Sequence, residues 1–264
     1  MEEKIKEKMK NIKYKLLVLS GKGGVGKTSV AVNLSYALAL KNFKTGILDI
    51  DIHGPNVAKM LGVEGKRLTV SDNEIEPYQV LPNLKVVSMA FLLEKSETPV
   101  IWRGPLKMKA ISQFLGDTKW GDLDFLIIDS PPGTGDEPLT ICQLIPGITG
   151  SIIVTTPQEI SLLDVRKTIR FSEKLNVPVI GIIENMSYLK CPKCGYKILL
   201  FGEGGGKKLE EEFGIELLGQ IPFEPEISKN ADIGKPFFNS EGESAKIFRD
   251  IVEKILKKIN VSTV

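Results

Sequence analysis

Hydrophobic residues in this chain fall into short runs, separated by stretches in which apolar positions recur at helical spacing. Several of the runs are continuous Val, Ile and Leu without alternation, which is typical of parallel strands covered on both faces. The predicted strands are 15–20, 45–51, 84–89, 123–129, 150–155, 178–184 and 215–220. The predicted helices are 27–41, 55–61, 105–116, 136–145, 160–175, 203–213 and 242–259. This alternation predicts an α/β fold, a doubly wound, mostly parallel sheet flanked by helices.

The same pattern predicts the domain organisation. Residues 1–13 form a charged N-terminal extension with helical character, and 14–264 form a single domain, since no linker, repeat or low-complexity stretch interrupts them. Residues 62–83 are less regular and predict a small hairpin. In such sheets ligands bind at the carboxyl ends of the strands. Polar residues that follow the predicted strands are therefore expected to meet at one edge of the sheet.

Composition narrows the classes of function. The 264 residues include 35 Lys and Arg against 33 Asp and Glu, so nothing indicates a basic surface for nucleic acid. No apolar run approaches the ~20 residues of a membrane span, and the N-terminus lacks the apolar core of a signal peptide. We expect a cytoplasmic protein that binds neither nucleic acid nor membranes. Three cysteines in a reducing compartment argue against a disulfide framework.

A glycine-rich loop follows the first predicted strand. Residues 21–29 read Gly-Lys-Gly-Gly-Val-Gly-Lys-Thr-Ser and fit the pattern G-x-x-x-x-G-K-[ST], in which a strand runs into a phosphate-binding loop that opens a helix. The glycines let backbone N–H groups converge on phosphate oxygens. Lys27 would reach the terminal phosphates, and Thr28 would offer its hydroxyl to Mg²⁺. We therefore predict a P-loop NTPase fold that binds a nucleotide with Mg²⁺ through Gly21, Lys22, Gly23, Gly24, Val25, Gly26, Lys27, Thr28 and Ser29.

Lys22 occupies a position that the general pattern leaves free. The sequence Lys-Gly-Gly-Val-Gly-Lys-Thr resembles the deviant Walker A class of P-loop ATPases. The resemblance implies that two subunits face each other across two nucleotides, and that this lysine reaches into the site of the partner. The alternative is a solvated surface lysine.

Carboxylates at the ends of two predicted strands would complete a phosphoryl-transfer site. Asp51 would orient or deprotonate the attacking water, and Asp49 would hold Asp51 in position without touching the substrate itself. Asp129 follows four apolar residues, the pattern of a Walker B strand, and would hold the water shell of Mg²⁺. The alternative for Asp49 and Asp51 is a pair of loop acids that cap the next helix.

Two further loops supply candidates for nucleotide binding. Ser130-Pro-Pro-Gly-Thr-Gly-Asp136 is rich in Pro and Gly, and Gly133 would place an N–H near the γ-phosphate, as in a nucleotide-sensitive switch. The alternative is a proline-rich turn. Asn185 ends another strand, and its side-chain amide would recognise the edge of adenine.

Cys191 and Cys194 form a C-x-x-C pair in a loop past strand 178–184. The pair suits Zn²⁺, an iron–sulfur cluster or a redox disulfide, and a reduced pair without ligand is also open. Cys142 lies in a helical pattern and is expected in the core. Two ligands cannot fill a tetrahedral zinc site or a four-iron cluster, whereas a two-fold dimer doubles them. A metal site that bridges two subunits is therefore the simplest interpretation.

Further motifs resemble the Mrp family of P-loop ATPases, over about residues 14–239. They are Trp102-Arg-Gly-Pro105, Trp120-Gly-Asp-Leu-Asp124, Ile128-Asp-Ser-Pro-Pro-Gly-Thr-Gly-Asp136, Val154-Thr-Thr-Pro-Gln158, Glu184-Asn-Met-Ser187, Cys191-Pro-Lys-Cys-Gly195, Phe201-Gly-Glu-Gly-Gly205 and Leu218-Gly-Gln-Ile-Pro222. The resemblance implies an iron–sulfur cluster carrier, a homodimer that holds a [4Fe–4S] cluster through Cys191 and Cys194 of both subunits. Such proteins hydrolyse ATP slowly and pass the cluster to apo-proteins. It also implies the roles given above for Lys22, Lys27, Thr28, Asp51 and Asp129, and an adenine contact for Asn185.

The sequence departs from that family in Asn56, where Ser is frequent, and in lacking an additional N-terminal cysteine motif. Two other functions stay open. One is an ATPase whose C-x-x-C loops hold only a structural Zn²⁺ at the dimer interface. The other is a spatial regulator of the chromosome- or septum-positioning type, whose amphipathic C-terminal helix, here residues 244–260, would bind a membrane. The simpler role for that helix is packing on the sheet.

Overall fold

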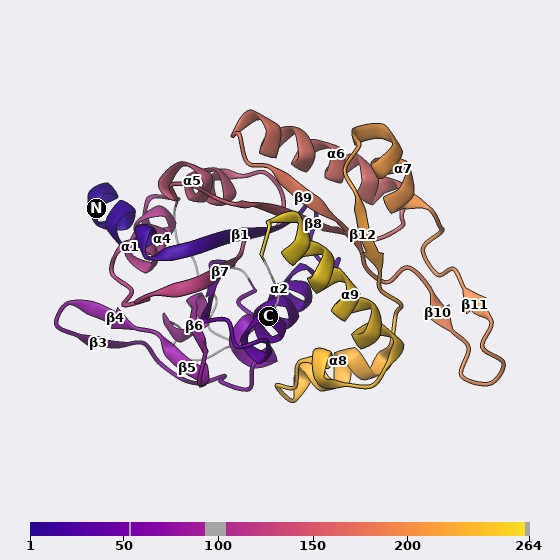
Figure 1. Ribbon diagram of the computed structural model, residues 1–264, viewed down its shortest axis with the longest axis horizontal. Coiled ribbons are helices and arrows are strands. Elements are labelled where there is room, and N and C mark those ends of the chain that lie inside the picture. The colour runs from indigo at the N-terminus through magenta and orange to yellow at the C-terminus, as the bar shows by residue number, and fades with distance from the viewer. Residues whose placement is uncertain (53, 93–103, 262–264) are drawn as a thin grey trace.

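A central sheet of eight strands organises the described part of the protein, in the order β12-β9-β8-β1-β7-β2-β6-β5 (Figure 1). The computed structural model describes residues 1–52, 54–92 and 104–261. Every strand pairs in parallel except β5, which runs antiparallel to β6 at the edge. The strands are β1 Ile12–Ser20, β2 Thr45–Asp49, β5 Tyr78–Leu81, β6 Leu84–Ser88, β7 Leu123–Asp129, β8 Gly150–Thr155, β9 Val179–Glu184 and β12 Leu217–Gln220. The predicted doubly wound, mostly parallel sheet is confirmed.

Helices cover both faces of this sheet (Figure 1). They are α1 Glu2–Lys10, α2 Lys27–Leu40, α3 Val57–Met60, α4 Gly104–Gly116, α5 Asp136–Leu144, α6 Glu159–Lys174, α7 Gly205–Phe213, α8 Pro225–Asp232 and α9 Glu243–Lys258, with 3-10 turns η1 Met89–Leu92 and η2 Phe237–Asn239. All of the predicted helices are present, although α3 is only one turn long. The sequence pattern missed α8, which is only eight residues long and contains no fully buried residue.

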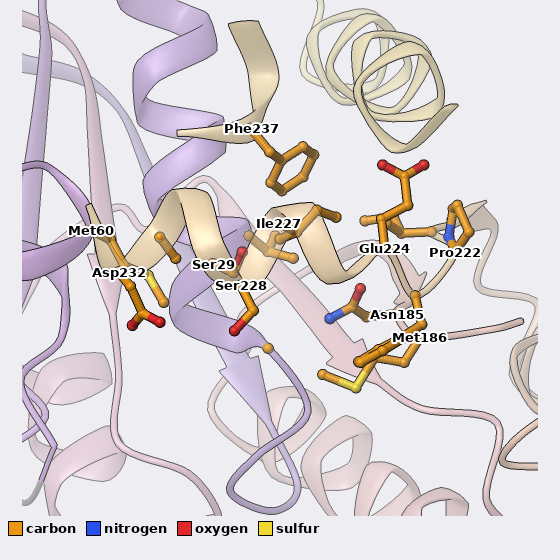
Figure 2. A pocket seen from close by; sticks show the side chains of 15 residues that line it. Ser29, Met60, Asn185, Met186, Pro222, Glu224, Ile227, Ser228, Asp232 and Phe237 are labelled. Atoms are coloured by element: carbon orange, nitrogen blue, oxygen red, sulfur yellow. The ribbon is translucent and has the colours of Figure 1, made fainter. Parts of the chain in front are cut away.

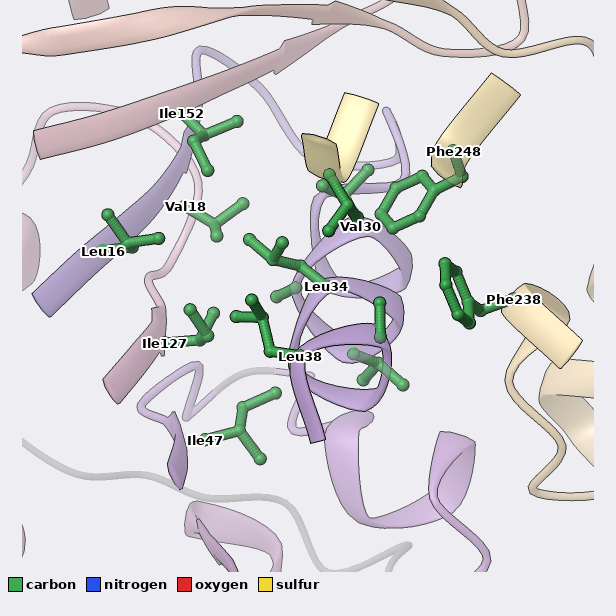
Figure 3. Close-up of a cluster of buried hydrophobic side chains, with 14 of the residues drawn as sticks. Leu16, Val18, Val30, Leu34, Leu38, Ile47, Ile127, Ile152, Phe238 and Phe248 are labelled. Carbon is green, nitrogen blue, oxygen red and sulfur yellow. The ribbon is translucent and has the colours of Figure 1, made fainter. Parts of the chain in front are cut away.

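Side chains alternate between two hydrophobic cores along each central strand. In β1, Leu16 and Val18 face a core shared with α2, α3 and α9, whereas Leu17 and Leu19 face a core shared with α1, α4, α5, α6 and α7. Figure 3 shows α2 between the sheet and the aromatic side chains of Phe238 and Phe248. Burial on both sides explains why these strands read as continuous apolar runs. It also makes β1 a rigid base for the loop that follows it.

The N-terminal residues pack into the domain. Ile5 and Met9 of α1 are fully buried against α4 and α5. Lys15 is also buried, and its Nζ donates to the carbonyls of Met9 and Ile12 at 3.3 and 2.9 Å. The predicted boundary between residues 13 and 14 lies inside β1.

Residues 62–83 contain the predicted hairpin, made of β3 Thr69–Ser71 and β4 Glu74–Glu76. Asp72 and Asn73 at its turn have positive φ angles of 52° and 62°, a conformation that Asn and Asp adopt more readily than most residues. A second hairpin, β10 Leu189–Lys190 with β11 Lys197–Ile198, stands outside the main sheet and projects from it (Figure 1). Cys191 and Cys194 lie in the turn of this second hairpin.

The C-terminal helix α9 packs its apolar face against the hydrophobic core. Phe248, Ile251, Val252, Ile255 and Leu256 are buried in the core against β12, η2 and α2. Packing therefore accounts for its amphipathic pattern. Among the described residues, no helix combines the length and apolarity needed to cross a membrane.

Candidate functional site

The glycine-rich loop lies at the carboxyl ends of the parallel strands, between β1 and the first turn of α2. Gly24 and Gly26 have φ angles of 79° and 87°, which L side chains rarely adopt. The loop borders a cavity of about 310 Å³, called here the P-loop cavity. It is lined by Ser20, Lys22, Gly23, Gly24, Gly26, Lys27, Thr28, Ser29, Asp51, Gly54, Asn56, Met60, Pro132 and Met186. A helix N-terminus beside lysine and hydroxyl groups suits a polyphosphate.

Two other predicted loop residues do not line the cavity but shape the loop. Val25 is buried in the core beneath it. A Cβ added at Gly21 would lie 2.5 Å from the backbone of Asp164 in α6, so this position admits only glycine without a shift of the helix. Both residues therefore act through the conformation of the loop.

Lys27, Thr28 and Asp129 form a buried cluster at the floor of the cavity. Lys27 Nζ donates to Asp129 Oδ1 at 2.5 Å, and Thr28 Oγ1 donates to Oδ2 at 2.7 Å. The Lys27 and Asp129 side chains are only 6% and 0% exposed. Burial raises the pKa of Asp129, while the ammonium and hydroxyl partners act in the opposite direction. The predicted Mg²⁺ residues Thr28 and Asp129 are thus brought together, and they offer the oxygen ligands that this ion prefers.

Asp49 and Asp51 lie next to this cluster but in different surroundings. Asp49 is fully buried beside Asp129 on neighbouring strands; burial and the charge of Asp129 raise its pKa to about 8. Its carboxylate accepts hydrogen bonds from the Asp51 N–H at 3.1 Å and from Ser88 Oγ at 2.7 Å. Asp51 is half-buried and lines the cavity, with its Oδ1 accepting from the Gly54 N–H at 3.2 Å. Asp49 therefore fixes the strand end from which Asp51 faces the cavity.

Lys22 lines the same cavity and bonds within its own chain. Its Nζ donates to Gln158 Oε1, at the start of α6, at 2.9 Å. The Lys22 carbonyl accepts from Ser20 Oγ at 3.0 Å. The ammonium group is thus held at the rim of the cavity by a neutral side chain and keeps its charge available for an anion.

The Pro- and Gly-rich loop after β7 approaches the P-loop directly. Gly133 has a φ angle of 89°, and its N–H donates to the Ser20 carbonyl at 2.8 Å. The N–H predicted to face the γ-phosphate is therefore already paired in this structure. Pro132 from the same loop lines the cavity, and the buried Ser130 hydroxyl has no hydrogen-bond partner among the described residues.

A second, largely apolar pocket of about 300 Å³ (Figure 2) adjoins the P-loop cavity. The linings of the two share Gly26, Ser29, Met60 and Met186. Its walls include Val30, Ile221, Pro222, Phe223, Ile227 and Phe237. Asn185 lies in its wall, and its Nδ2 donates to the Val25 carbonyl at 2.9 Å. A flat apolar ring with polar edges fits this lining. The sequence pointed to Asn185 but not to the apolar walls, which come from α2, α8, η2 and the loop after β12, segments far apart in the chain.

Cys191 and Cys194 lie at the tip of the β10–β11 hairpin, away from the cavity. Cys191 is half-buried and Cys194 exposed. The backbone N–H groups of Cys194 and Lys193 and the Cys194 thiol donate to the Cys191 sulfur, which lowers the pKa of Cys191. Gly195 takes a positive φ of 73° and its N–H donates to the Cys191 carbonyl at 2.9 Å. This turn holds two thiols in a form suited to a metal.

No third metal ligand accompanies the two cysteines in the chain as described. No group of three or more His, Cys, Asp and Glu residues arranged to hold a metal is found among residues 1–52, 54–92 and 104–261. Cys142 of α5, expected in the core, is half-buried and packs against its edge, and burial raises the pKa of its thiol to about 11. Trp102 and Arg103, which belong to one of the family motifs, lie outside the described residues.

Known proteins resemble this chain over nearly its full length. The family described as "ParA: NUBPL iron-transfer P-loop NTPase" matches residues 11–256. A protein of Saccharolobus solfataricus named "Iron-sulfur cluster carrier protein" is 53% identical, over 96% of this chain and 86% of its own. The protein of the same name from Methanocaldococcus jannaschii is 50% identical, over 98% and 89%.

Solved structures agree with the fold. A nucleotide-binding protein of Archaeoglobus fulgidus, solved in complex with ADP and with Co, has 39% identity and a TM-score of 0.81, covering 94% of this chain and 97% of its own. The cell division ATPase MinD of Pyrococcus furiosus has a TM-score of 0.64 at 23% identity, over 92% and 98%, and supports the fold alone. The matched P-loop, the Asp129 cluster and the cysteine turn all lie within the region of similarity. The chain therefore belongs to the family of NUBPL iron-transfer P-loop NTPases.

Proposed function

We propose that this protein is an iron–sulfur cluster carrier that binds ATP with Mg²⁺, hydrolyses it slowly, and transfers its cluster to apo-proteins. The observation that carries the proposal is the cysteine turn: two thiols, one with a lowered pKa, lie on the hairpin that follows β9 and Asn185 in the chain. A carrier needs ligands that can be reached by a recipient, and Cys194 is exposed. The relatives that carry the name of cluster carrier support the same role.

The cargo in this proposal is a [4Fe–4S] cluster shared by two copies of the chain. Such a cluster takes four thiolates, and the described residues supply two at this turn. A two-fold interface would bring the same turn of each subunit to one place and supply the other two. Tyr196, Leu199 and Leu200 beside the turn are 72%, 46% and 45% exposed, as expected for apolar residues that a second subunit would cover.

The nucleotide would lie across the two adjoining cavities. Its phosphates fit the P-loop cavity, with Lys27 and the α2 N-terminus balancing their charge, and adenine fits the apolar pocket beside Asn185. Mg²⁺, held by Thr28 and through water by Asp129, would supply positive charge to the phosphates. Asp51, which lines the P-loop cavity, would orient the attacking water.

The position of Lys22 supports the proposed slow turnover. In the single chain Lys22 Nζ donates a hydrogen bond to Gln158 Oε1 at 2.9 Å and does not reach a second nucleotide site. We propose that dimerisation on ATP moves it into the partner's site, where it completes the charge needed for phosphoryl transfer. Hydrolysis would then wait for assembly of the dimer. The protein would act in the cytoplasm, where thiols stay reduced.

A structural zinc site is the second candidate, and the same turn favours it. N–H groups that donate to a cysteine sulfur stabilise a Zn²⁺ thiolate as well as an iron thiolate, so the chemistry of the turn fits both metals. The membrane-binding regulator has no comparable support, because the apolar face of α9 is buried in the core.

Transfer of the cluster tests the proposal. The protein would be reconstituted anaerobically with iron and sulfide, then mixed with an apo-protein whose activity requires a [4Fe–4S] cluster. We expect the recipient to regain activity, and Cys191→Ser with Cys194→Ser to transfer nothing. If the wild type takes up zinc but no iron–sulfur cluster under these conditions, the structural-zinc function replaces the carrier function.

A further inference from the structure

One buried carboxylate holds both ends of the segment that carries the cysteines. Glu184, fully buried at the end of β9, accepts from Ser187 Oγ through Oε1 at 2.9 Å and from the Gly206 N–H through Oε2 at 2.6 Å. The chain between those two donors is the excursion 188–205, with the β10–β11 hairpin and both cysteines. Gln220 on β12 donates to Oε1 at 2.7 Å. One side chain therefore accepts hydrogen bonds from the residues just before and just after the excursion.

The groups that meet the Glu184 carboxylate are the neutral donors of these hydrogen bonds. No Lys or Arg forms an ion pair with it among the described residues. Its Oε2 instead meets the N-terminus of α7, where the helix dipole favours a negative group. A Cβ on Gly206 would lie 2.6 Å from the Leu217 side chain and 3.2 Å from Glu184 Oε2, so glycine allows this close approach. A buried charge held in this way has little freedom to change partners.

The main chain around Glu184 also adjoins the apolar pocket. The Glu184 backbone carbonyl accepts from the Ile221 N–H at 2.8 Å, and the Tyr188 carbonyl accepts from the Phe223 N–H at 2.7 Å. Ile221 and Phe223 are walls of the apolar pocket. Asn185, the next residue after Glu184, bonds to the P-loop carbonyl of Val25. A movement of these walls would therefore reach the base of the cysteine hairpin within one or two hydrogen bonds.

We propose that Glu184 is a positioning residue that couples occupancy of the apolar pocket to the cysteine hairpin. It rests on the proposed function, since it assumes that a nucleotide fills the pocket and a metal binds the cysteines. Glu184 clamps the excursion at Ser187 and Gly206 and shares the strand end with Asn185. A change in the pocket then alters the placement of the thiols, which is the coupling between two sites that defines allosteric control.

The conservative variant Glu184→Gln tests the clamp. An amide has one acceptor oxygen, so it can accept from Ser187 and Gln220 or from Gly206, but not at both ends. The matched control is Glu210→Gln on α7, whose carboxylate accepts the Leu217 N–H at 3.0 Å and touches neither end of the excursion. Ser187→Ala, which removes one hydroxyl at one end, serves if Glu184→Gln fails to fold by circular dichroism.

The readout uses Co²⁺ as the probe for the thiols. Full-length apo-protein would be loaded with Co²⁺, freed of excess metal, and followed by its thiolate charge-transfer bands as a chelator removes the ion, with and without Mg-ATP. In the wild type we expect Mg-ATP to change the release rate by about five-fold or more. In Glu184→Gln that ratio falls to about one, while ATP affinity stays within about three-fold of the wild type and Glu210→Gln keeps the wild-type ratio.

Each other result has a separate meaning. A wild-type ratio that survives in both Glu184→Gln and Ser187→Ala overturns the role of Glu184 and leaves the carrier function standing. A wild type that loads Co²⁺ on its cysteines but shows no effect of Mg-ATP overturns the coupling alone. A wild type that loads no more Co²⁺ than Cys191→Ser overturns the proposed function and the coupling together.

Discussion

Replacing Lys27 by Met should destabilise the nucleotide-free protein in a manner that depends on pH. Lys27 Nζ lies 2.5 Å from Asp129 Oδ1, and the two side chains are 6% and 0% exposed. Breaking a buried ion pair by removing one partner costs about 3–5 kcal/mol, because the other charge stays buried. Asp129 also adjoins Asp49, whose pKa is already raised to about 8. The variant therefore keeps two buried carboxyl groups and loses the ammonium that compensated them.

Protonation limits this loss at low pH. Burial already raises the pKa of Asp129 in the folded state, and removal of the Lys27 ammonium raises it further. Asp129 titrates alike in the unfolded wild type and the unfolded variant, so the loss relative to the wild type grows as pH rises through the already raised folded pKa of wild-type Asp129, by at most about 1.4 kcal/mol per pH unit. We expect Lys27→Met to lose roughly 2 kcal/mol at pH 5 and roughly 3–5 kcal/mol at pH 8.

Urea unfolding at pH 5 and pH 8, in EDTA and without nucleotide, measures these values. The control is the double variant Lys27→Met with Asp129→Asn, which removes both charges and should recover most of the loss at pH 8. A loss of the same size at both pH values would refute the reasoning. So would a double variant no more stable than Lys27→Met, since the buried charge would then not be its cause.

Three further changes test the rest of the site. The stability of Asp49→Asn relative to the wild type should increase from pH 5 to pH 8. A folded pKa of about 8 means that Asp49 takes up a proton on folding, so its contribution to wild-type stability falls as pH rises through this window; a melting-temperature difference between the two proteins that does not change with pH would contradict this. Asn185→Ala loses the bond to the Val25 carbonyl and should weaken Mg-ATP binding about five-fold by calorimetry, whereas an unchanged affinity would remove Asn185 from the site. Lys22→Ala should abolish ATP-dependent dimerisation in sedimentation velocity and uncouple nucleotide from cluster release, with ADP affinity within about two-fold; dimerisation as in the wild type would refute its role across the interface.

The main elements of the fold were predictable because burial on both faces leaves a strong pattern. The continuous apolar runs of β1, β7 and β8 gave the parallel sheet. Elements at the edge were harder. The edge strand β5 has exposed or half-exposed residues throughout, so no apolar run marks it. The burial of α1 depends on Ile5 and Met9 alone within a highly charged segment.

Within the site, local motifs predicted residues but not their partners. The pattern around Lys27 and Thr28 fixed the P-loop, because loop, strand and helix are contiguous in sequence. The bond from Lys22 to Gln158 joins residues 136 positions apart, and its formation depends on β1 lying next to β8, an order that periodicity does not reveal. Glu184 left a weak signal, a charged residue at the end of an apolar strand, but the clamp became visible only with α7 in place.

The central claim is that one four-iron cluster is held by Cys191 and Cys194 of two copies of this chain. Native mass spectrometry of the anaerobically reconstituted protein, with Mössbauer spectra of the same sample, tests it most directly. We predict a dimer that carries one [4Fe–4S] cluster, about two irons per chain, and no cluster on Cys191→Ser. A cluster found on a monomer, or a dimer that holds only zinc between its subunits, would contradict the claim.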